Sequence, residues 1–347
     1  MTASSTSSRS NISTAELTEA LECELSGRSG EPRRVVHLTR RPSRYATSAT
    51  IEDIDAHLDD GRSLRLILKD MSRDALLESA RRTKPTFLYD PRREIEVYRK
   101  ILAKADLGTA IRYGSAADPR RRRYWLLLEK VPGLELYQVG ELELWQEVAR
   151  RLAEMHDRLA RHVDDRSGPS AARLLLHDRD FYLLWLRRAE RFVGEAGASQ
   201  RSRSALAWLA SRYGAIVDRL LDLPVSVIHG EFYASNVLVE RRPSGIRVCP
   251  VDWEMAAVGP GLVDLAALTS GKWEEADRAA VALTYRAGLT RRDSWPPEPE
   301  AFLAAVDHCR LHLCLQWLGW SPGWSPPAEH AQDWLAEALV LAERLCA

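Results

Sequence analysis

The segment VIHGEFYASNVLV, residues 227–239, places three polar side chains between two apolar runs. The first run ends at His229 and Gly230, and Glu231 follows at once. Asn236 comes five residues after the acid, directly before the second apolar run. A His-Gly pair between two strand-like runs is typical of a tight turn. A carboxylate and an amide in such a turn indicate a functional loop, although HGE alone occurs often by chance.

A further acid follows one hairpin later in the chain. The sequence NVLVERRPSGIRVCPVD, residues 236–252, predicts two strands joined by a turn. The open end of this hairpin would bring Asn236 and Asp252 together, with Glu231 in the turn before them. Mg²⁺ prefers carboxylate and amide oxygens, and a kinase needs such ligands beside a group that orients the acceptor hydroxyl. The three residues therefore indicate metal-assisted phosphoryl transfer.

Composition narrows the class of protein. The chain has 347 residues, enough for two domains or one large two-lobed domain. Basic and acidic residues both number 49, so the basic excess typical of nucleic-acid-binding proteins is missing. No apolar run reaches about 18 residues, and the Ser-rich start lacks the apolar core of a secretion signal. We expect a cytoplasmic protein with no membrane segment and no nucleic-acid partner.

The cysteines argue against a disulfide framework. They are few, odd in number and irregularly spaced: Cys23, Cys249, Cys309, Cys314 and Cys346. This pattern favours a reducing compartment. His308 and His312 in HCRLHLC would share a helix face, but no CxxC or HExxH pattern accompanies them. We interpret these histidines as core residues rather than metal ligands.

The first third of the chain predicts a tail, a short helix and a sheet. Residues 1–12 are polar and are expected to be disordered. Ser13 and Glu16 form a capping-box pattern that opens a short helix, and GRSGEPRR ends it. Five strands are predicted, at RVVHLT, TIEDIDAHL, SLRLILKD, TAIRYG and RYWLLLEKV. The segment DPRREIEVYRKILAKADL, after the third strand, predicts a helix.

Helical patterns dominate the rest of the chain. They are predicted at 141–162, 178–195, 203–222, 263–270, 274–287, 299–318 and 328–346. The extended patterns expected here are NVLVE and IRVCPVD alone. We therefore divide the chain into a tail with a short helix over residues 1–31, a β-rich lobe over 32–130 and a helical lobe over 131–347.

These motifs together resemble the aminoglycoside phosphotransferase and choline kinase family. That family's signature is His-Gly-Asp, four residues, Asn, and later Asp-Trp-Glu, and here it reads HGEFYASN and VDWEMAAVGPGLVDLA. RLAEMH in the first large helix also fits, and the resemblance runs from about residue 33 to the end. It implies an α+β, protein-kinase-like bilobal fold, with a small β-rich N-terminal lobe that binds the nucleotide and a larger, mainly helical C-terminal lobe.

The resemblance also implies a role for each matching residue. Asn236 and Asp252 match the two Mg²⁺ ligands. Glu231 stands at the place of the catalytic Asp, which orients the acceptor hydroxyl and accepts its proton. Lys69 in LILKD matches the strand lysine that holds the α- and β-phosphates. Glu94 matches the helix glutamate that pairs with this lysine.

Alternatives remain for two of these positions. Glu96 is the rival of Glu94, two residues further on and on a different helix face. No Gly-rich loop joins the first two strands, where the sequence reads TRRPSRYATSAT. Ser48 is the best match for a serine that covers the phosphates, with Ser43 as the alternative.

Other residues are expected to support the site. The order of the lobes places the hinge that meets adenine at Glu129 and Val131. We interpret His229 as a hydrogen-bonded structural residue of the turn rather than a proton carrier. Asp264 could brace the loop. Glu254 is expected to support the metal ligands rather than bind the metal.

The acceptor is expected in the helical lobe, between Glu231 and the C-terminal helices. Four tryptophans fall within a short stretch there: Trp317, Trp320, Trp324 and Trp334. They could stack on a ring or cage a cation, but we favour a helix pair sealed by large aromatics. Tyr233, inside the motif loop, is the better candidate for an acceptor contact. No acidic run marks a pocket for a polycationic aminoglycoside.

We therefore expect an ATP- and Mg²⁺-dependent kinase for a hydroxyl of a small molecule, such as a sugar, amino alcohol, antibiotic or related metabolite. The alternative is a catalytically impaired pseudokinase that binds nucleotide, favoured by the missing Gly-rich loop and by Glu231 in place of Asp. The longer side chain moves the carboxylate by roughly 1.5 Å, and such a shift can cost on the order of a hundredfold in rate. Retention of the lysine, its glutamate partner and both metal ligands favours an active enzyme.

Overall fold

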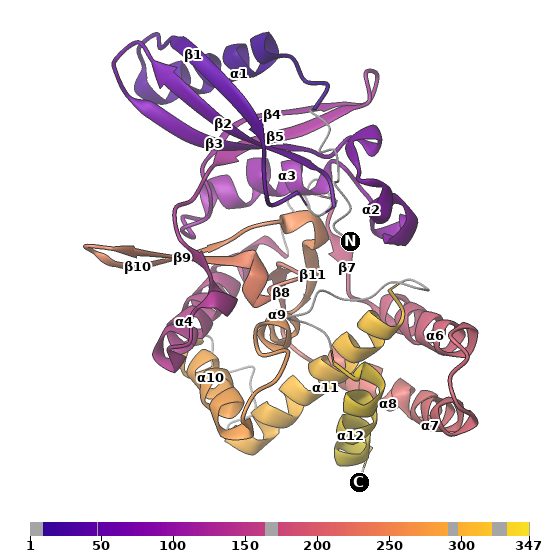
Figure 1. Cartoon of the computed structure of the whole chain (residues 1–347). Helices are drawn as coiled ribbons and strands as arrows, with labels where there is room; N and C mark the ends of the chain where they lie inside the picture. The colour runs from indigo at the N-terminus through magenta and orange to yellow at the C-terminus, as the bar shows by residue number, and fades with distance from the viewer. Residues whose placement is uncertain (1–9, 47, 164–172, 291–297, 321–331, 347) are drawn as a thin grey trace.

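The computed structural model describes residues 10–46, 48–163, 173–290, 298–320 and 332–346. Figure 1 shows a β-rich region that contains the N-terminal strands and, below it, a larger region built mainly from helices. The β9–β10 hairpin lies at the junction of the two regions. The expected α+β organisation is therefore present.

A five-stranded antiparallel sheet forms the β-rich region. Its strand order is β1-β2-β3-β5-β4, with β1 (Val35–Pro42), β2 (Thr50–Leu58), β3 (Ser63–Asp70), β4 (Arg112–Asp118) and β5 (Arg123–Glu129). β2 buries every second residue, although its sequence alternates only loosely. The reason is that Glu52 is one of its buried residues and pairs with Arg40 across the sheet at 2.8 Å. A paired acid thus takes a position that the pattern assigns to an apolar residue.

Helix α1 (Thr14–Ser29) covers one face of this sheet. The Ser13 hydroxyl caps it by accepting the N–H of Glu16 at 3.1 Å. The Glu16 carboxylate does not complete the capping box. It accepts the indole N–H of Trp125 at 3.0 Å instead. The helix buries Leu17, Leu21 and Leu25 at a spacing of four. It continues through GRS and ends at Gly30 (φ 72°), so the helix is longer than the sequence predicts.

The residues before α1 also contact the sheet. The Ser10 hydroxyl donates to Asp70 at 2.7 Å, and the Ser10 N–H donates to Glu52 at 2.7 Å. Ile12 is buried beside α1. The prediction of a disordered tail over residues 1–12 is therefore wrong for residues 10–12, because a serine and a single isoleucine find partners in the sheet. Residues 1–9 lie outside the described residues.

Helix α3 (Arg93–Lys100) lies between the sheet and the helical region, as Figure 1 shows. It buries Ile95, Val97 and Tyr98. The chain reaches it from β3 through a long connection with two single turns, η1 (Arg73–Ala75) and η2 (Thr86–Leu88), and one short helix, α2 (Glu78–Thr83). This connection runs along the boundary of the two regions and contacts both.

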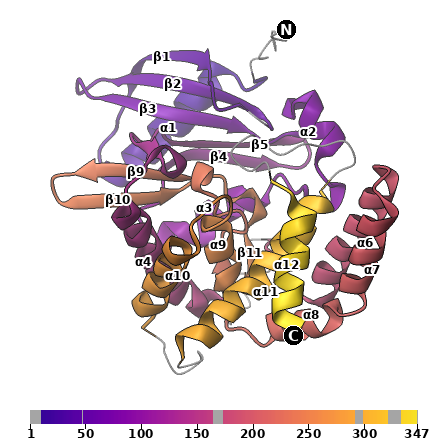
Figure 2. The same cartoon turned by 60° about the horizontal axis from the view of Figure 1, so that its bottom comes forward.

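Helices form most of the second region. They are α4 (Leu142–Leu159), α6 (Arg179–Glu195), α7 (Gln200–Ala210), α8 (Tyr213–Leu221), α9 (Gly261–Leu268), α10 (Glu275–Gly288), α11 (Pro299–Leu318) and α12 (Trp334–Cys346). The helical segment predicted at 203–222 is two helices, interrupted at Ser211 and Arg212. Figure 2 shows α12 lying against α11, while α4 packs on α10.

Short strands in this region escaped the sequence analysis. β6 (Leu134–Glu135) joins β9 (Val237–Arg242) and β10 (Gly245–Pro250) in one sheet. β7 (Leu175–Leu176), β8 (Val225–Ile228) and β11 (Ala257–Pro260) form another. The expectation of extended structure in NVLVE and IRVCPVD alone is wrong, because segments of two to four residues are too short to show a period of two.

The C-terminal tryptophans pack mainly into the core. Trp317 stacks on Trp334 with ring centroids 5.1 Å apart, and Trp320 stacks on Trp185 at 5.9 Å. Trp334 is buried. These contacts support the interpretation as an aromatic seal between helices. Trp324 lies outside the described residues.

The cysteines and histidines carry no crosslink in the described part of the chain. All five cysteines are free thiols, and three are buried. No group of three or more His, Cys, Asp or Glu among the described residues could hold a metal ion. The His312 ring approaches the hydroxyl of Tyr213 at 3.2 Å, and His308 contacts the carbonyl of Ala304 at 2.7 Å. Within the described helices, none is long and apolar enough to cross a membrane.

We expect the free energy of unfolding to fall as the pH drops from 6.5 toward 4. Burial lowers the pKa of His177 to about 4 in the folded protein, and the unfolded chain takes up this proton near pH 6.5. The unfolded state binds more protons in this window, so this histidine alone contributes a loss of about 1.4 kcal/mol per pH unit. Burial also lowers the pKa of His312, which adds to the slope. Urea unfolding at pH 7 and pH 5 measures the loss.

The matched variant for this experiment is His177→Phe. A phenyl ring keeps the stacking on Phe181, whose centroid lies 4.2 Å from that of His177, and removes the titration. Its free energy of unfolding should fall less between pH 7 and pH 5. An equal fall in both proteins would contradict the assignment of a neutral buried imidazole.

Candidate active site

The loop after β8 holds Glu231 through a turn that requires glycine. Gly230 has φ 85°, in the left-handed region that side chains disfavour. A Cβ at this position would also lie 2.3 Å from the carbonyl oxygen of Met255. The HGE motif therefore packs directly against the backbone that follows Asp252, and this close approach fixes the position of Glu231.

A buried carboxylate braces the same turn. Asp264, on α9, accepts the backbone N–H groups of His229 at 2.7 Å and Gly230 at 2.8 Å. His156, on α4, approaches the same carboxylate at 3.1 Å through Nε2 and the Tyr285 hydroxyl at 2.8 Å through Nδ1. Burial would raise the pKa of Asp264, but the hydrogen bond from His156 and the backbone donors hold it below its usual range. Asp264 is thus a brace, as one reading of the sequence had it.

His229 is held by hydrogen bonds at both ring nitrogens. Its Nε2 lies 2.9 Å from the carbonyl of Val251, which can only accept, so Nε2 carries the proton. Its Nδ1 accepts the N–H of Glu231 at 3.3 Å. Burial lowers the pKa of the imidazole. These bonds support the structural interpretation of this histidine.

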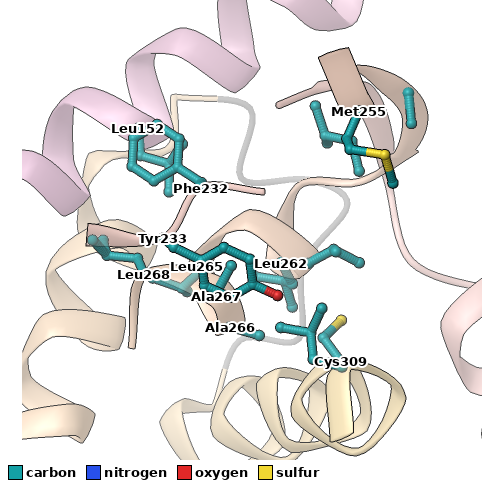
Figure 3. Packing of buried hydrophobic residues seen from close by; sticks show 14 of the residues in the cluster. Leu152, Phe232, Tyr233, Met255, Leu262, Leu265, Ala266, Ala267, Leu268 and Cys309 are labelled. Carbon is teal, nitrogen blue, oxygen red and sulfur yellow. The ribbon is translucent and has the colours of Figure 1, made fainter. Parts of the chain in front are cut away.

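Aromatic side chains seat the loop on the helices below it. Figure 3 shows Phe232 beside Leu152 of α4, and Tyr233 lying across α9 near Leu265. Both aromatic residues are buried, and Tyr233 meets Trp317 edge to face at 5.3 Å. Tyr233 therefore packs in the core rather than facing an open pocket, contrary to the suggestion that it contacts the acceptor.

The β9–β10 hairpin brings the two expected metal ligands together. Val237 pairs with Pro250, and the N–H of Val251 donates to the carbonyl of Asn236 at 2.9 Å. The Asn236 amide nitrogen donates to the carbonyl of Glu231 at 3.0 Å, which leaves its amide oxygen outside this bond. Asp252 follows directly, in a left-handed conformation with φ 67°. Asn236, Asp252 and Glu231 are therefore neighbours.

Lys69 lies between two carboxylates. It sits on β3, in the middle of the sheet, and is buried. Its ammonium contacts Glu94 at 2.5 Å and Asp252 at 2.5 Å. Burial opposes its charge, but these two acids more than compensate and raise the pKa of Lys69 above its ordinary value. The lysine is therefore a fixed positive charge that joins the sheet to the hairpin.

The structure places Glu94, not its rival, on the lysine. Glu94 also accepts the backbone N–H of Trp253 at 3.2 Å, so it holds both Lys69 and the residue after Asp252. Glu96 instead pairs with Lys100 at 2.7 Å on its own helix. The different helix faces of the two acids explain this outcome.

Glu231 lies in an acidic environment. It is partly buried. Burial, with the nearby carboxylates of Glu254 and Asp252, raises the pKa of Glu231 to about 8. Glu254 itself binds Lys84, which the sequence analysis did not single out. A carboxyl whose pKa lies near neutrality can exchange a proton with a neighbouring group.

The expected hinge residues lie at the end of β5 and just beyond it. The Glu129 N–H donates to the carbonyl of Ile111 at 2.7 Å, and Val131 is buried. The Glu129 carboxylate receives two hydrogen bonds of 2.7 Å from the guanidinium of Arg247 on β10. The end of β5 and the β9–β10 hairpin are thus clamped together. No sequence signal pairs residues this far apart.

The two candidate serines differ in exposure. Ser43 is buried, and its N–H donates to the carbonyl of Ile51 at 2.9 Å. Ser48 is partly buried and accepts the N–H of Leu77 at 3.0 Å through its carbonyl. Ser48 therefore remains the better placed of the two for a ligand.

A pocket of about 510 Å³ opens beside the catalytic loop. Its wall includes Ala234, three residues after Glu231, and the edge-to-face pair Trp145 and Trp273, whose ring centroids are 4.9 Å apart. Lys272 and Asp277 add one charge of each sign. Trp145 lies in ELELWQEV and Trp273 in GKWEEAD, and neither stretch carries a motif that points to a ligand.

The oxygen donors of the site fit a magnesium ion. Asn236 supplies an amide oxygen and Asp252 a carboxylate, from the two arms of one hairpin. Mg²⁺ commonly takes one or two protein oxygens and completes its shell with water and substrate phosphates. A dedicated cage of protein ligands is therefore not needed here, in agreement with the lack of a larger His, Cys, Asp or Glu cluster in the described residues.

Solved structures of similar fold are small-molecule kinases and phosphotransferases. A microcompartment-associated aminopropanol kinase has a TM-score of 0.57 and 16% identity, over 89% of this chain and 90% of that one. Plasmodium vivax ethanolamine kinase has a TM-score of 0.54 and 10% identity, over 90% and 82%. The GDP complex of aminoglycoside 2'-phosphotransferase-IIIa has a TM-score of 0.53 and 12% identity, over 94% and 97%. These matches confirm the protein-kinase-like bilobal fold.

Sequence comparison identifies the family. No curated protein sequence matches the chain. The sequence model of the phosphotransferase enzyme family matches residues 53–302, which include every motif of the site from Lys69 to Asp264. The chain therefore belongs to the phosphotransferase enzyme family.

Proposed function

We propose that the protein transfers the γ-phosphate of ATP, in a Mg²⁺-dependent reaction, to a hydroxyl of a small molecule. The observation that carries this proposal is the contact of Lys69 with both Glu94 and Asp252, beside Asn236. A buried lysine between a helix acid and a hairpin acid, next to an amide oxygen, is the arrangement that phosphoryl transfer requires for its phosphates and its metal.

Each residue has a distinct task in this reaction. Lys69 holds the α- and β-phosphates, and Glu94 keeps its ammonium in place. Asn236 and Asp252 hold the Mg²⁺, which neutralises charge on the phosphate oxygens. Glu231 orients the acceptor hydroxyl and takes up its proton. Ser48 covers the phosphates, and the backbone of Glu129 and Val131 meets the adenine.

Glu231 has a longer side chain than an aspartate, and the backbone that carries it is held in one position. Gly230 lies against Met255 and donates its N–H to Asp264, so the loop is held in one position. The carboxylate of a glutamate reaches roughly 1.5 Å beyond that of an aspartate. We propose that Glu231 serves an acceptor hydroxyl bound correspondingly further from the loop.

The 510 Å³ pocket supports a site for the acceptor. Its volume suits a small organic molecule. The Trp145–Trp273 pair offers an apolar edge for a ring or a carbon skeleton, while Lys272 and Asp277 balance each other in charge. A neutral or singly charged acceptor such as a sugar or an amino alcohol fits this lining better than a polycation.

A catalytically impaired pseudokinase is the second candidate, favoured by Glu231 at the catalytic position. It would bind ATP with Mg²⁺ and raise the thermal stability of the chain without phosphorylating any acceptor. Phosphoryl transfer that disappears in Glu231→Gln would exclude it.

Asp252→Asn should lower turnover by at least about a hundredfold, because the amide removes the negative charge that binds the metal. The measurement is ³¹P detection of transfer from ATP over a panel of sugars, amino alcohols and antibiotics. Asp222→Asn, at an exposed aspartate outside the site, is the matched control and should behave as wild type. Equal turnover by wild type and Asp252→Asn would refute the proposed role.

Glu231→Gln should lower kcat by about 10²- to 10⁴-fold, the usual contribution of a general base. Its affinity for Mg²⁺-ATP should stay near that of wild type, because the amide keeps the size of the side chain. Glu231→Asp keeps the carboxylate but shortens the side chain, so it tests the position of the acid alone. It should also lower kcat, by on the order of a hundredfold. Wild-type kcat in the glutamine variant would show that the acid is not the base.

Trp273→Ala should raise KM for the acceptor by about tenfold, because it removes one face of the pocket. The dissociation constant of Mg²⁺-ADP, measured by calorimetry, should not change. Trp208→Ala on α7 is the control for the loss of a partly buried indole away from the pocket. An unchanged acceptor KM would place the acceptor elsewhere.

A further inference from the structure

The connection between β3 and α3 crosses from the sheet to the helical region. Its Phe87 packs edge to face on Trp185 of α6, with ring centroids 5.5 Å apart, and lies 5.4 Å from the guanidinium of Arg188. At its end, Arg93 donates to the carbonyl of Glu254 at 2.6 Å and to that of Leu88 at 3.0 Å. The segment is therefore fixed at both regions and can hold a side chain at a defined place over the site.

Lys84 is the side chain that this connection directs into the site. Its ammonium binds the carboxylate of Glu254, two residues after Asp252, and its side chain is only 9% exposed. Lys84, Lys69 and Glu94 line the same small cavity, together with Ala49 just before β2. Two lysines from different parts of the chain thus converge on one acidic loop.

The cavity between the lysines is small. Its volume of about 20 Å³ has room for about one water molecule. A phosphate group that enters must therefore replace an existing contact. The ion pair of Lys84 and Glu254 is suited to this exchange, because a phosphate offers the ammonium another anionic oxygen.

We infer that Lys84 is a second phosphate-binding lysine, which leaves Glu254 and contacts the γ-phosphate when the nucleotide binds. The inference rests on the proposed function and deepens it. The transferred phosphoryl group must lie between Lys69, which holds the other phosphates, and Glu231, which holds the acceptor. Lys84 comes from the connection above Glu254, and its charge acts on both Asp252 and Glu231.

A lysine at this position would stabilise the transition state of phosphoryl transfer. Phosphoryl transfer spreads negative charge over the oxygens of the moving group, and fixed cations stabilise it. Lys69 is already committed to Glu94 and to the α- and β-phosphates. Lys84 would supply the positive charge at the γ-position that a Gly-rich loop, missing from this chain, otherwise helps to supply with its backbone N–H groups.

The test measures binding rather than turnover. Calorimetry gives the dissociation constants of Mg²⁺-ADP and of the non-hydrolysable Mg²⁺-AMPPNP for each variant. In Lys84→Met, the constant for AMPPNP should rise at least about tenfold, as expected for a lost charged hydrogen bond, while that for ADP should change less than about twofold. Lys84→Arg should restore most of the preference for AMPPNP. Lys104→Met, at an exposed lysine, is the matched control.

Glu254→Gln separates phosphate binding from a merely structural tie. It breaks the ion pair but keeps the lysine, so the preference for AMPPNP over ADP should persist. If Lys84→Met and Glu254→Gln lose the same thermal stability and both keep the wild-type ratio of the two constants, the lysine is structural and the inference is wrong. If wild type binds neither nucleotide, the proposed function itself fails. A third outcome overturns the Lys84 inference alone. In it, wild type binds both nucleotides and Lys69→Met abolishes this binding, but Lys84→Met keeps the wild-type ratio of the two dissociation constants.

Discussion

One ammonium group, on Lys69, joins the two regions of the molecule. Its two acid partners come from α3 and from the end of the β9–β10 hairpin, 25 and 183 positions away in the sequence. Burying a lysine is costly unless it is paired, so the sheet, α3 and the hairpin are stable together only in this arrangement. The position of Asp252 follows from it, and so does the geometry offered to a metal and to phosphates.

A second buried charge plays the same part on the other side of the loop. Asp264 receives two backbone N–H groups of the HGE turn and a histidine from α4, so the catalytic loop is tied to two helices. Gly261 lets α4 and α10 approach it, because a Cβ there would lie 2.7 Å from both His156 and the Tyr285 hydroxyl. The lysine aligns the hairpin with the sheet, and the aspartate aligns the HGE turn with the helices.

The sequence predicted the parts of the site that lie inside regular elements or short motifs. Motifs shared with the family pointed to Lys69, Glu94, Asn236 and Asp252, and the predicted hairpin placed Asn236 near Asp252. In the structure Lys69 contacts both Glu94 and Asp252. Lys84 could not be found in this way. It lies in a connection with no clear period, and its partner is 170 positions away.

Two further features, the length of α1 and the contact of Glu129 with Arg247, were not predicted for similar physical reasons. Helix α1 is longer than predicted because Gly27, a typical helix-ending residue, does not end it, and the left-handed residue that does is Gly30. Gly27 has open space around it and a helical conformation. The clamp of Glu129 on Arg247 joins two strands of different sheets, and such a pairing depends on how the regions pack rather than on local sequence.

The hydrogen bond from Ser10 to Asp70 couples a segment far from the site to the strand that carries Lys69. Asp70 is the immediate neighbour of Lys69, so the far N-terminal end of the chain supports the backbone on which the central lysine is mounted. The family match begins only at residue 53. Substitutions near Ser10, which lies outside this match, would therefore alter the stiffness of the strand that carries Lys69 from a position away from the site.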